Sequence, residues 1–272
     1  MIVASNPALA SILHSVVGHQ ACRVEFRVIN AATDQHNFEL TPQMVSNIQS
    51  ASLLVLSGGG LDRWLLPATP KNSLVFEQLG ALRSFSTPQA HPVAHPSGGQ
   101  IDPHFWLDPV HVALYLDKVA HAVYQTFPQH CILPKIQENI SNFHLDVARL
   151  KQESVNAVRP LGIRRVVATH DAYHYFIAFL ERQGVAIAYR AFYELHVGSR
   201  QWIELMQTLG HEEGLVIWDV PPFSTCHQLE AKFGRPIPQC LRLDPSGNLL
   251  YQQQGADMDY VQFYRAFLKG FQ

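Results

Sequence analysis

Three histidines and one aspartate in this chain have the side-chain chemistry of a metal site. His36, His104 and His170 each lie near the end of a short apolar segment, and Asp244 follows in the segment Leu-Arg-Leu-Asp-Pro. Three neutral imidazoles with one carboxylate or one water would satisfy a tetrahedral Zn²⁺ at about 2.0 to 2.2 Å per bond. The spacings of 68, 66 and 74 residues exclude a local zinc finger, whose ligands lie a few residues apart. We therefore expect a folded scaffold to bring the four side chains together between structural units.

The chain alternates short β-rich runs with longer amphipathic stretches, which is typical of an α/β protein with mainly parallel sheets. Apolar runs at residues 53–56, 165–168 and 214–218 each end at a loop and indicate buried strands. The second run leads into His170, and the third leads into Asp219. Because ligands gather at the carboxyl ends of strands in open α/β sheets, both side chains are expected near a site.

Apolar residues recur every three or four positions between residues 128 and 159, and this period predicts one long helix. We expect the helix to connect two α/β lobes. The predicted division is an N-terminal lobe at 1–127, a linking helix at 128–159 and a C-terminal lobe at 160–272. The periodic residues are Ile132, Ile136, Ile140, Phe143, Val147 and Leu150.

Charge and hydropathy exclude several classes of partner. The formal net charge of -2, with 20 Lys and Arg against 22 Asp and Glu, provides no broad basic field, so nucleic acid is not an expected partner. The sequence contains no run of the roughly 20 apolar residues that a membrane-spanning helix needs. The first residues also lack a charged segment followed by an apolar segment and a cleavage site. We expect that any export signal is absent or has been removed.

Four cysteines form no C-x-x-C pair, which argues against a thiolate zinc site or a thioredoxin-like motif. Cys226 and Cys240 flank 13 residues that contain Gly234, Pro236 and Pro238. A disulfide across this segment would contribute about 3 kcal/mol if the geometry allows it. Two reduced, buried thiols are the alternative.

Four motifs, taken in order along the chain, carry a family resemblance. They are Asp34-Gln-His36, Asp102-Pro-His104-Phe-Trp-Leu-Asp-Pro109, Thr169-His170-Asp-Ala-Tyr-His-Tyr-Phe176 and Leu243-Asp244-Pro-Ser-Gly247. Together they resemble the metal-binding substrate-binding proteins of ABC importers, and most closely the zinc-specific branch. The resemblance implies two α/β lobes joined by a long rigid helix, with the metal in the cleft between them.

Carried over residue by residue, the resemblance makes His36 the first ligand, His104 the second, His170 the third and Asp244 the carboxylate ligand. The third position discriminates among metals, because the manganese and iron members place a Glu there whereas a His goes with zinc. Imidazole suits borderline Zn²⁺, and carboxylate oxygen suits Mn²⁺. Asp244 also fits a turn in which the carboxylate bonds the backbone, and water would then be the fourth ligand.

Other residues of the motifs have two interpretations each. Asp102 and Asp171 flank two of the candidate ligands, and they either orient imidazoles or cap helices. Trp106, Tyr173 and Phe176 are predicted to belong to the core and the cleft wall rather than to recognition.

The chain departs from the family pattern at three places. Gln35 stands where relatives have Pro, and the segment Asp219-Val-Pro-Pro-Phe223 stands where they have Glu-Pro-Gln-Phe. Residues 86–100 form a short segment with His91 and His95, where many zinc relatives carry a long insertion rich in His and acidic residues. Metal capture by this segment is one hypothesis, and a solvated, turn-rich loop is the other.

The expected function is capture of Zn²⁺ in the periplasm and delivery to the permease of an ABC importer by a monomeric binding protein. A manganese or iron importer component is the alternative. A zinc metallohydrolase is the enzymatic competitor, but H-E-x-x-H, G-x-S-x-G and a phosphate-binding loop are absent from the sequence, so we expect no enzyme. A zinc chaperone or surface adhesin on the same scaffold would differ in its partner rather than in its site.

Overall fold

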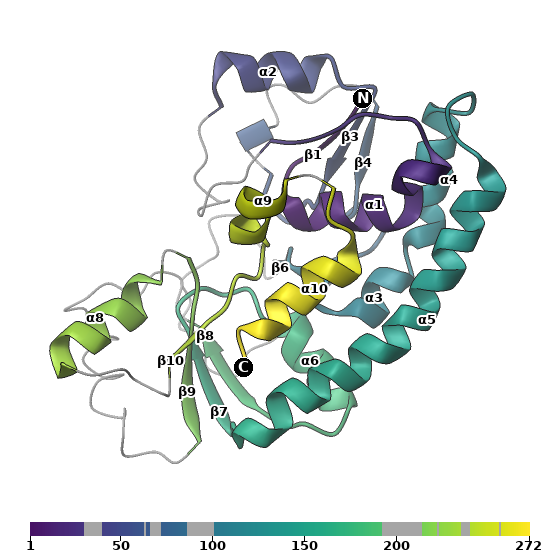
Figure 1. Ribbon diagram of the computed structural model, residues 1–272. Helices are drawn as coiled ribbons and strands as arrows, with labels where there is room; N and C mark the ends of the chain where they lie inside the picture. Colours follow the sequence, from purple (N-terminus) through teal and green to yellow (C-terminus); the bar gives the residue numbers. More distant parts are fainter. Residues whose placement is uncertain are drawn as a thin grey trace.

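Two parallel sheets and one long helix organise the chain (Figure 1). The computed structural model describes residues 1–29, 40–62, 64–65, 72–85, 101–191, 214–221, 223–234, 240–255 and 257–272. The first sheet has the order β2-β1-β3-β4, and the second has the order β10-β9-β7-β8. All pairs within these two sheets are parallel, which confirms the predicted α/β class.

The strands are short, and a small antiparallel pair, β5-β6, accompanies the two sheets. Their bounds are β1 Ile2–Ala4, β2 Phe26–Val28, β3 Leu53–Leu56, β4 Ser73–Val75, β5 Arg83–Ser84, β6 Ile101–Asp102, β7 Arg165–Ala168, β8 Ala188–Ala191, β9 Leu215–Asp219 and β10 Cys240–Arg242. The helices are α1 Pro7–Ala21, α2 Pro42–Gln49, η2 Phe105–Leu107, α3 Pro109–Ala113, α4 Leu116–Thr126, α5 Leu133–Val158, η3 Arg159–Leu161, α6 His174–Arg182, α8 Ser224–Phe233, α9 Asn248–Gln254 and α10 Tyr260–Lys269.

Strand β3 illustrates why these apolar runs form parallel sheets. All four of its residues are buried, and successive side chains point to opposite faces of the sheet. Leu53 and Val55 belong to the core cluster that includes α1, whereas Leu54 and Leu56 pack in the cluster that includes Ile48 of α2. Helices therefore cover both faces of the first sheet, as a continuous apolar run requires.

Helix α5 is the predicted long helix, and it begins five residues later than the predicted start at residue 128. Pro134 lies in the first turn of α5, where a missing backbone N–H costs nothing. Ile132, the residue before the helix, has an extended backbone. The periodic face of α5 is buried, including Ile136, Phe143 and Leu150. Among the helices that the structure describes, none is long and apolar enough to cross a membrane.

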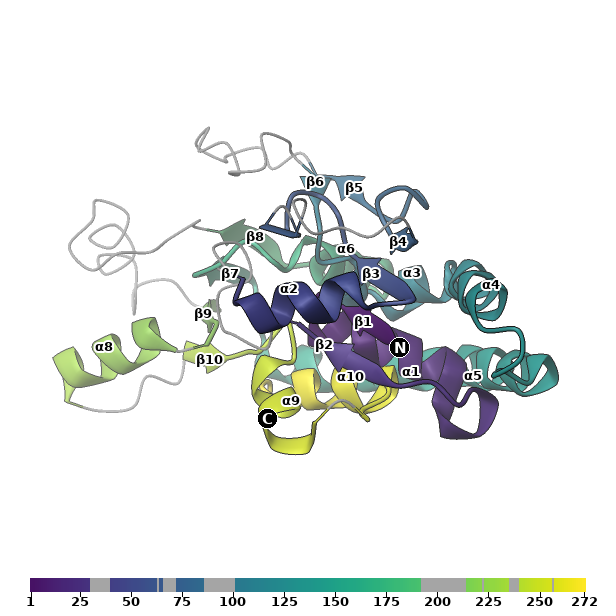
Figure 2. The same cartoon turned by 90° about the horizontal axis from the view of Figure 1, so that it is seen from above.

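Helix α10 brings the end of the chain back to its beginning, and α1, α5 and α10 lie side by side (Figures 1 and 2). The Tyr260 N–H donates to Ser15 Oγ at 2.9 Å, and Ser154 Oγ donates to Tyr264 Oη at 3.3 Å. Phe267 of the same helix contacts Phe176 of α6 in an edge-on geometry, with ring centroids 5.0 Å apart. Residues after 254 thus contact both halves of the chain, whichever lobe they are assigned to.

Two disulfides fix distant segments. Cys226 and Cys240 form the bridge that the sequence allowed, and it joins α8 to β10. Cys22 and Cys131 form a second bridge, 109 residues apart in sequence, which joins the end of α1 to the segment before α5. Sequence spacing gave no reason to pair Cys22 with Cys131.

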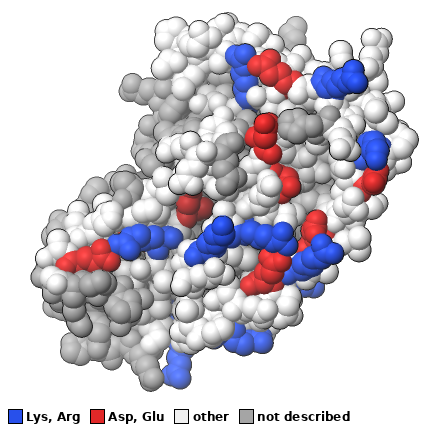
Figure 3. Space-filling view, viewed as in Figure 1, with Lys and Arg blue, Asp and Glu red and all other residues white. Residues whose placement is uncertain are grey.

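The face shown in Figure 3 carries Lys and Arg side chains interspersed with Asp and Glu. Surface ion pairs include Arg265 with Glu153 at 2.8 Å and Arg242 with Glu230 at 2.6 Å. The near balance of charge in the sequence is therefore also local on this face.

Candidate metal-binding site

Two of the predicted metal ligands meet although they come from different halves of the chain. His104 lies between β6 and η2, and His170 lies two residues beyond the end of β7. Their ring centroids are 5.6 Å apart and their planes are perpendicular. Since His170 follows the carboxyl end of a parallel strand, its position agrees with the general location of ligand sites in such sheets.

His104 is almost fully buried, and Asp102 holds its ring. Both the backbone N–H and Nδ1 of His104 lie 2.8 Å from Asp102 Oδ1. A neutral imidazole that donates from Nδ1 carries its lone pair on Nε2, and this carboxylate–histidine arrangement is common in metal sites. Asp102 therefore orients an imidazole, which was one of the two roles that the sequence left open. Trp106 contacts the same ring edge-on, with centroids 5.3 Å apart.

A glycine turn after β3 supports the backbone before His104. Ser57 Oγ donates to the Pro103 carbonyl oxygen at 2.8 Å. Gly59 has φ of +60°, and a Cβ there would lie 3.2 Å from the Pro103 Cβ and 2.9 Å from a methyl of Leu82. A side chain at Gly59 would thus crowd the segment that presents His104. This turn is the structural role of the glycine run at 58–60.

Two carboxylates hold the same turn. The Gly58 N–H donates to Asp62 Oδ2 at 2.8 Å, and the Gly59 N–H donates to Glu77 Oε2 at 2.9 Å. Asp62 is 6% exposed. Burial raises the pKa of Asp62 to about 6, and the charge of Glu77 adds to this rise while the Gly58 N–H opposes it. The protein therefore carries a buried carboxylate at neutral pH at a cost in stability.

Asp244 lies at the beginning of α9, where backbone N–H groups surround its carboxylate. Oδ1 accepts from Gly247 at 3.0 Å and from Ser246 at 3.3 Å, and Oδ2 accepts from Leu249 at 2.8 Å. These bonds are the turn geometry that was the alternative to metal ligation. Burial raises the pKa of Asp244, and these N–H groups lower it.

A tryptophan connects the segment of His104 to the segment of Asp244. Trp106 Nε1–H donates to the Pro245 carbonyl oxygen at 2.7 Å, and the whole Trp106 side chain is buried. Tyr173 and Phe176 are also fully buried, which confirms that these three aromatic residues belong to the core.

Asp171 pairs with residues other than the candidate ligands. Its Oδ1 lies 2.9 Å from His174 Nε2 and accepts from Tyr189 Oη at 3.0 Å. Burial opposes ionisation of Asp171, but the hydrogen bond from His174 prevails and lowers the pKa of Asp171. Burial alone would lower the pKa of His174. The bond to Asp171 outweighs this effect, so the pKa of His174 is raised. Asp171 thus orients His174 beside the candidate site.

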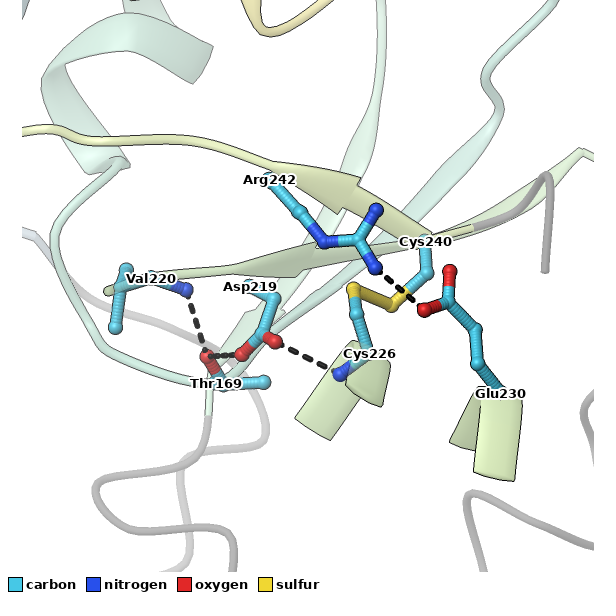
Figure 4. The surroundings of a disulfide bond; sticks show 7 residues. All are labelled: Thr169, Asp219, Val220, Cys226, Glu230, Cys240 and Arg242. Carbon is cyan, nitrogen blue, oxygen red and sulfur yellow. Dashed lines mark hydrogen bonds and ion pairs between the residues drawn. A yellow bond between two sulfur atoms is a disulfide. The ribbon is translucent and has the colours of Figure 1, made fainter. Parts of the chain in front are cut away.

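Asp219 is the residue whose role sequence reasoning missed, although its position at a strand end was noted. Figure 4 shows its carboxylate between Thr169 and the backbone of Cys226. Burial raises the pKa of Asp219, against the hydrogen bonds from Cys226 and Thr169. The signal that could have found it is the order of the strands, because β9 lies between the strands that lead to His170 and Asp244.

His36, His91 and His95 lie outside the described residues. Within the described part of the chain, no three His, Cys, Asp or Glu side chains gather closely enough to hold a metal ion. The structure brings His104 and His170 together, and it links the segment of Asp244 to that of His104 through Trp106 and Pro245.

Two α/β halves joined by a long helix, with two histidines meeting between them, define a two-lobed binding protein. The family model described as "Zinc-uptake complex component A periplasmic" (ZnuA) matches residues 2–268. The chain belongs to this family. The matched family is one of uptake components and not of enzymes, in agreement with the expectation that this chain is no enzyme.

Individual relatives are distant. The high-affinity zinc uptake system protein ZnuA of Paracoccus denitrificans is 25% identical over 209 residues, covering 64% of this chain and 62% of the relative. The manganese-binding lipoprotein MntA of Halalkalibacterium halodurans is 23% identical over 184 residues, covering 64% and 56%. The alignments thus span less than two thirds of these curated relatives.

The fold is similar over nearly the whole chain to that in a crystal structure of ZnuA. The TM-score is 0.72 at 20% identity, and the match covers 98% of this chain and 96% of the other. The two-lobed architecture that the resemblance implied is therefore the fold of this protein.

Proposed function

We propose that this chain captures Zn²⁺ between its two halves and delivers it to the membrane permease of an ABC importer. The ion is cargo, and no chemistry is done on it. The proposed ligands are His36, His104 and His170, with Asp244 or a water as the fourth. In this proposal the protein acts as a monomer in the periplasm, and its division into lobes 1–127 and 160–272 around the helix at 128–159 gives the cleft.

The observation that carries the proposal is the meeting of His104 and His170. The imidazoles of His104 and His170, 66 residues apart in sequence, make an edge-to-face contact with ring centroids 5.6 Å apart. The carboxylate of Asp102 lies 2.8 Å from Nδ1 of His104, a contact that favours the tautomer protonated at Nδ1 and so makes Nε2 the ligating atom. A histidine with a purely structural role in the core would not need an imidazole from the other half of the chain beside it.

A manganese or iron importer component is the second candidate, and the aligned manganese-binding lipoprotein supports considering it. Donor chemistry favours zinc, because both described candidate ligands that meet are imidazoles. Mn²⁺ prefers carboxylate, carbonyl and water oxygens, whereas imidazole suits Zn²⁺.

The test is zinc affinity by chelator competition, with Mn²⁺ as the challenger. Wild-type protein should bind one equivalent of zinc that Mn²⁺ does not displace, and the double variant His104→Ala/His170→Ala should lose it. His121→Ala/His144→Ala, which removes two exposed histidines, is the matched control and should bind like the wild type. Zinc binding that is indifferent to His104 and His170 would refute the proposed site, and preference for Mn²⁺ would favour the second candidate.

Zinc affinity should also fall as pH drops through the imidazole range near ~6.5, since each ligand nitrogen must lose its proton before it binds the metal. An affinity that stayed constant between mildly acidic and neutral pH would argue against a histidine site.

A further inference from the structure

Asp219 lies at the carboxyl edge of the second sheet, between the strands that carry two of the candidate ligands. Strand β9 pairs with β7 on one side, with Ala168 opposite Trp218, and with β10 on the other, with Arg242 opposite Asp219. His170 follows β7 by two residues, and Asp244 follows β10 by two residues. Asp219, at the end of β9, therefore lies between these two segments.

The contacts of Asp219 reach both of these segments. Thr169 Oγ1 donates to Asp219 Oδ1 at 2.9 Å, and the backbone N–H of Leu243 donates to the Asp219 carbonyl oxygen at 2.8 Å. Thr169 immediately precedes His170, and Leu243 immediately precedes Asp244. The second carboxylate oxygen, Oδ2, accepts from the backbone N–H of Cys226 at 2.8 Å (Figure 4).

We propose that the carboxylate of Asp219 is a positioning group that fixes the backbone beside His170 through the hydroxyl of Thr169. The proposal rests on the proposed function, because it concerns the geometry of the same metal site. Asp219 does not itself touch the metal in this account. Its carboxylate joins three segments: the end of β9, Thr169 after β7, and the first turn of α8.

Burial and hydrogen bonds hold the Asp219 carboxylate in place. Asp219 is 1% exposed, and both of its carboxylate oxygens accept hydrogen bonds from groups of different elements. Cys226 lies in the first turn of α8, where backbone N–H groups have no partner within the helix and favour a negative charge. The Cys226–Cys240 disulfide joins this turn to β10, so the donor on Oδ2 is itself attached to the strand that leads to Asp244.

Thr169 is the residue that precedes His170, and its hydroxyl links it to the Asp219 carboxylate. Its hydroxyl donates to Asp219 and accepts from the Val220 N–H at 3.3 Å. Replacing it by Val keeps the shape of the side chain but leaves the Asp219 carboxylate and the Val220 N–H without this partner. Replacement by Ser keeps the hydroxyl and removes only a methyl group.

The experiment measures zinc dissociation constants by chelator competition and the visible spectrum of the Co²⁺-loaded protein, which reports ligand geometry. Thr169→Val and Asp219→Asn should weaken zinc binding by about 10-fold, the lower end of the effect of removing a group bonded directly to a ligand, because Asp219 acts on His170 only through Thr169. Both should also shift the Co²⁺ bands. Thr169→Ser should restore most of the affinity that Thr169→Val loses.

Glu230→Gln is the control, because Glu230 pairs with Arg242 beside the same disulfide, whereas the Asp219 carboxylate bonds Thr169 and Cys226 (Figure 4). It should bind zinc like the wild type with an unchanged Co²⁺ spectrum. Thermal melts of the metal-free variants separate loss of fold from loss of geometry, and Thr169→Val, the mildest change, keeps the test decisive if Asp219→Asn does not fold.

The outcomes for this proposal and for the proposed function are distinct. If the wild type binds zinc and His170→Ala loses it, yet Thr169→Val binds within two-fold of the wild type with the same Co²⁺ spectrum, the positioning role of Asp219 is wrong and the metal site stands. If the wild type binds no zinc, or His170→Ala binds it unchanged, both proposals fail.

Discussion

The substitution Asp62→Asn should change how the stability of this protein depends on pH. Asp62 is buried, and its pKa is raised from 3.8 to about 6, chiefly by burial. The folded protein therefore binds the Asp62 proton more tightly than the unfolded chain does. Ionisation of Asp62 opposes folding, so the stability linked to its proton is fully present below about pH 4 and is lost as the pH rises through about 6.

The magnitude follows from the shift. A difference of roughly 2 pKa units corresponds to about 3 kcal/mol in the free energy of unfolding over the full pH range. By the linkage relation, roughly 1 to 2 kcal/mol of this change falls between pH 7.5 and pH 5. Asp62→Asn removes the titrating group and keeps an oxygen that can accept from the Gly58 N–H.

The assay is urea denaturation of metal-free protein at several pH values. As the pH falls from 7.5 to 5, the stability of the wild type should rise by roughly 1 to 2 kcal/mol relative to that of Asp62→Asn. Other groups titrate in both proteins and cancel in this difference. Asp117→Asn, which removes an exposed carboxylate on α4, is the control for the loss of one carboxylate. A difference between the wild type and Asp62→Asn that is constant within about 0.3 kcal/mol, or that changes with the opposite sign, would refute the reasoning.

Three further predictions concern the links between segments. Cys22→Ser/Cys131→Ser opens a bridge between residues 109 apart, so the free energy of unfolding should fall by about 4 to 5 kcal/mol, and a loss under 1 kcal/mol in urea titrations would contradict this. Trp106→Phe removes the bond to the Pro245 carbonyl and leaves that buried oxygen unpaired, which should lower the free energy of unfolding by about 1 to 3 kcal/mol. It should also weaken zinc binding, and an unchanged zinc affinity would show that this bond does not support the metal site. Arg265→Ala breaks an exposed pair with Glu153 and should cost no more than about 1 kcal/mol, as thermal melts with and without 1 M salt can check.

The strands were predictable because burial on both faces leaves a simple signature. The apolar runs at 53–56 and 165–168 coincide with β3 and β7, and the run at 214–218 differs from β9 by one residue at each end. The start of α5 was less predictable. Apolar periodicity continues back to Ile132, but Ile132 is extended, and only the fold shows that Cys131 just before it is bonded to Cys22.

The Cys22–Cys131 bridge shows where spacing carries no information. Cys226 and Cys240 could be paired on paper because the short segment between them is rich in turn residues. A pairing across 109 residues depends on α1 and α5 lying side by side, which is a property of the tertiary packing. No local pattern in the sequence encodes it.

The two histidines that meet at the candidate site differ in the same way, and this difference explains how much of the site could be predicted. The support of His104 is local, since Asp102 lies two residues before it and bonds both its backbone and its ring. The Asp-Pro-His motif itself therefore indicates the carboxylate that orients His104. Thr169, the residue before His170, bonds Asp219 of a neighbouring strand, 50 residues away in sequence. This link becomes visible only when the order of the strands is known, whereas Asp102 lies in the same short motif as the candidate ligand that it orients.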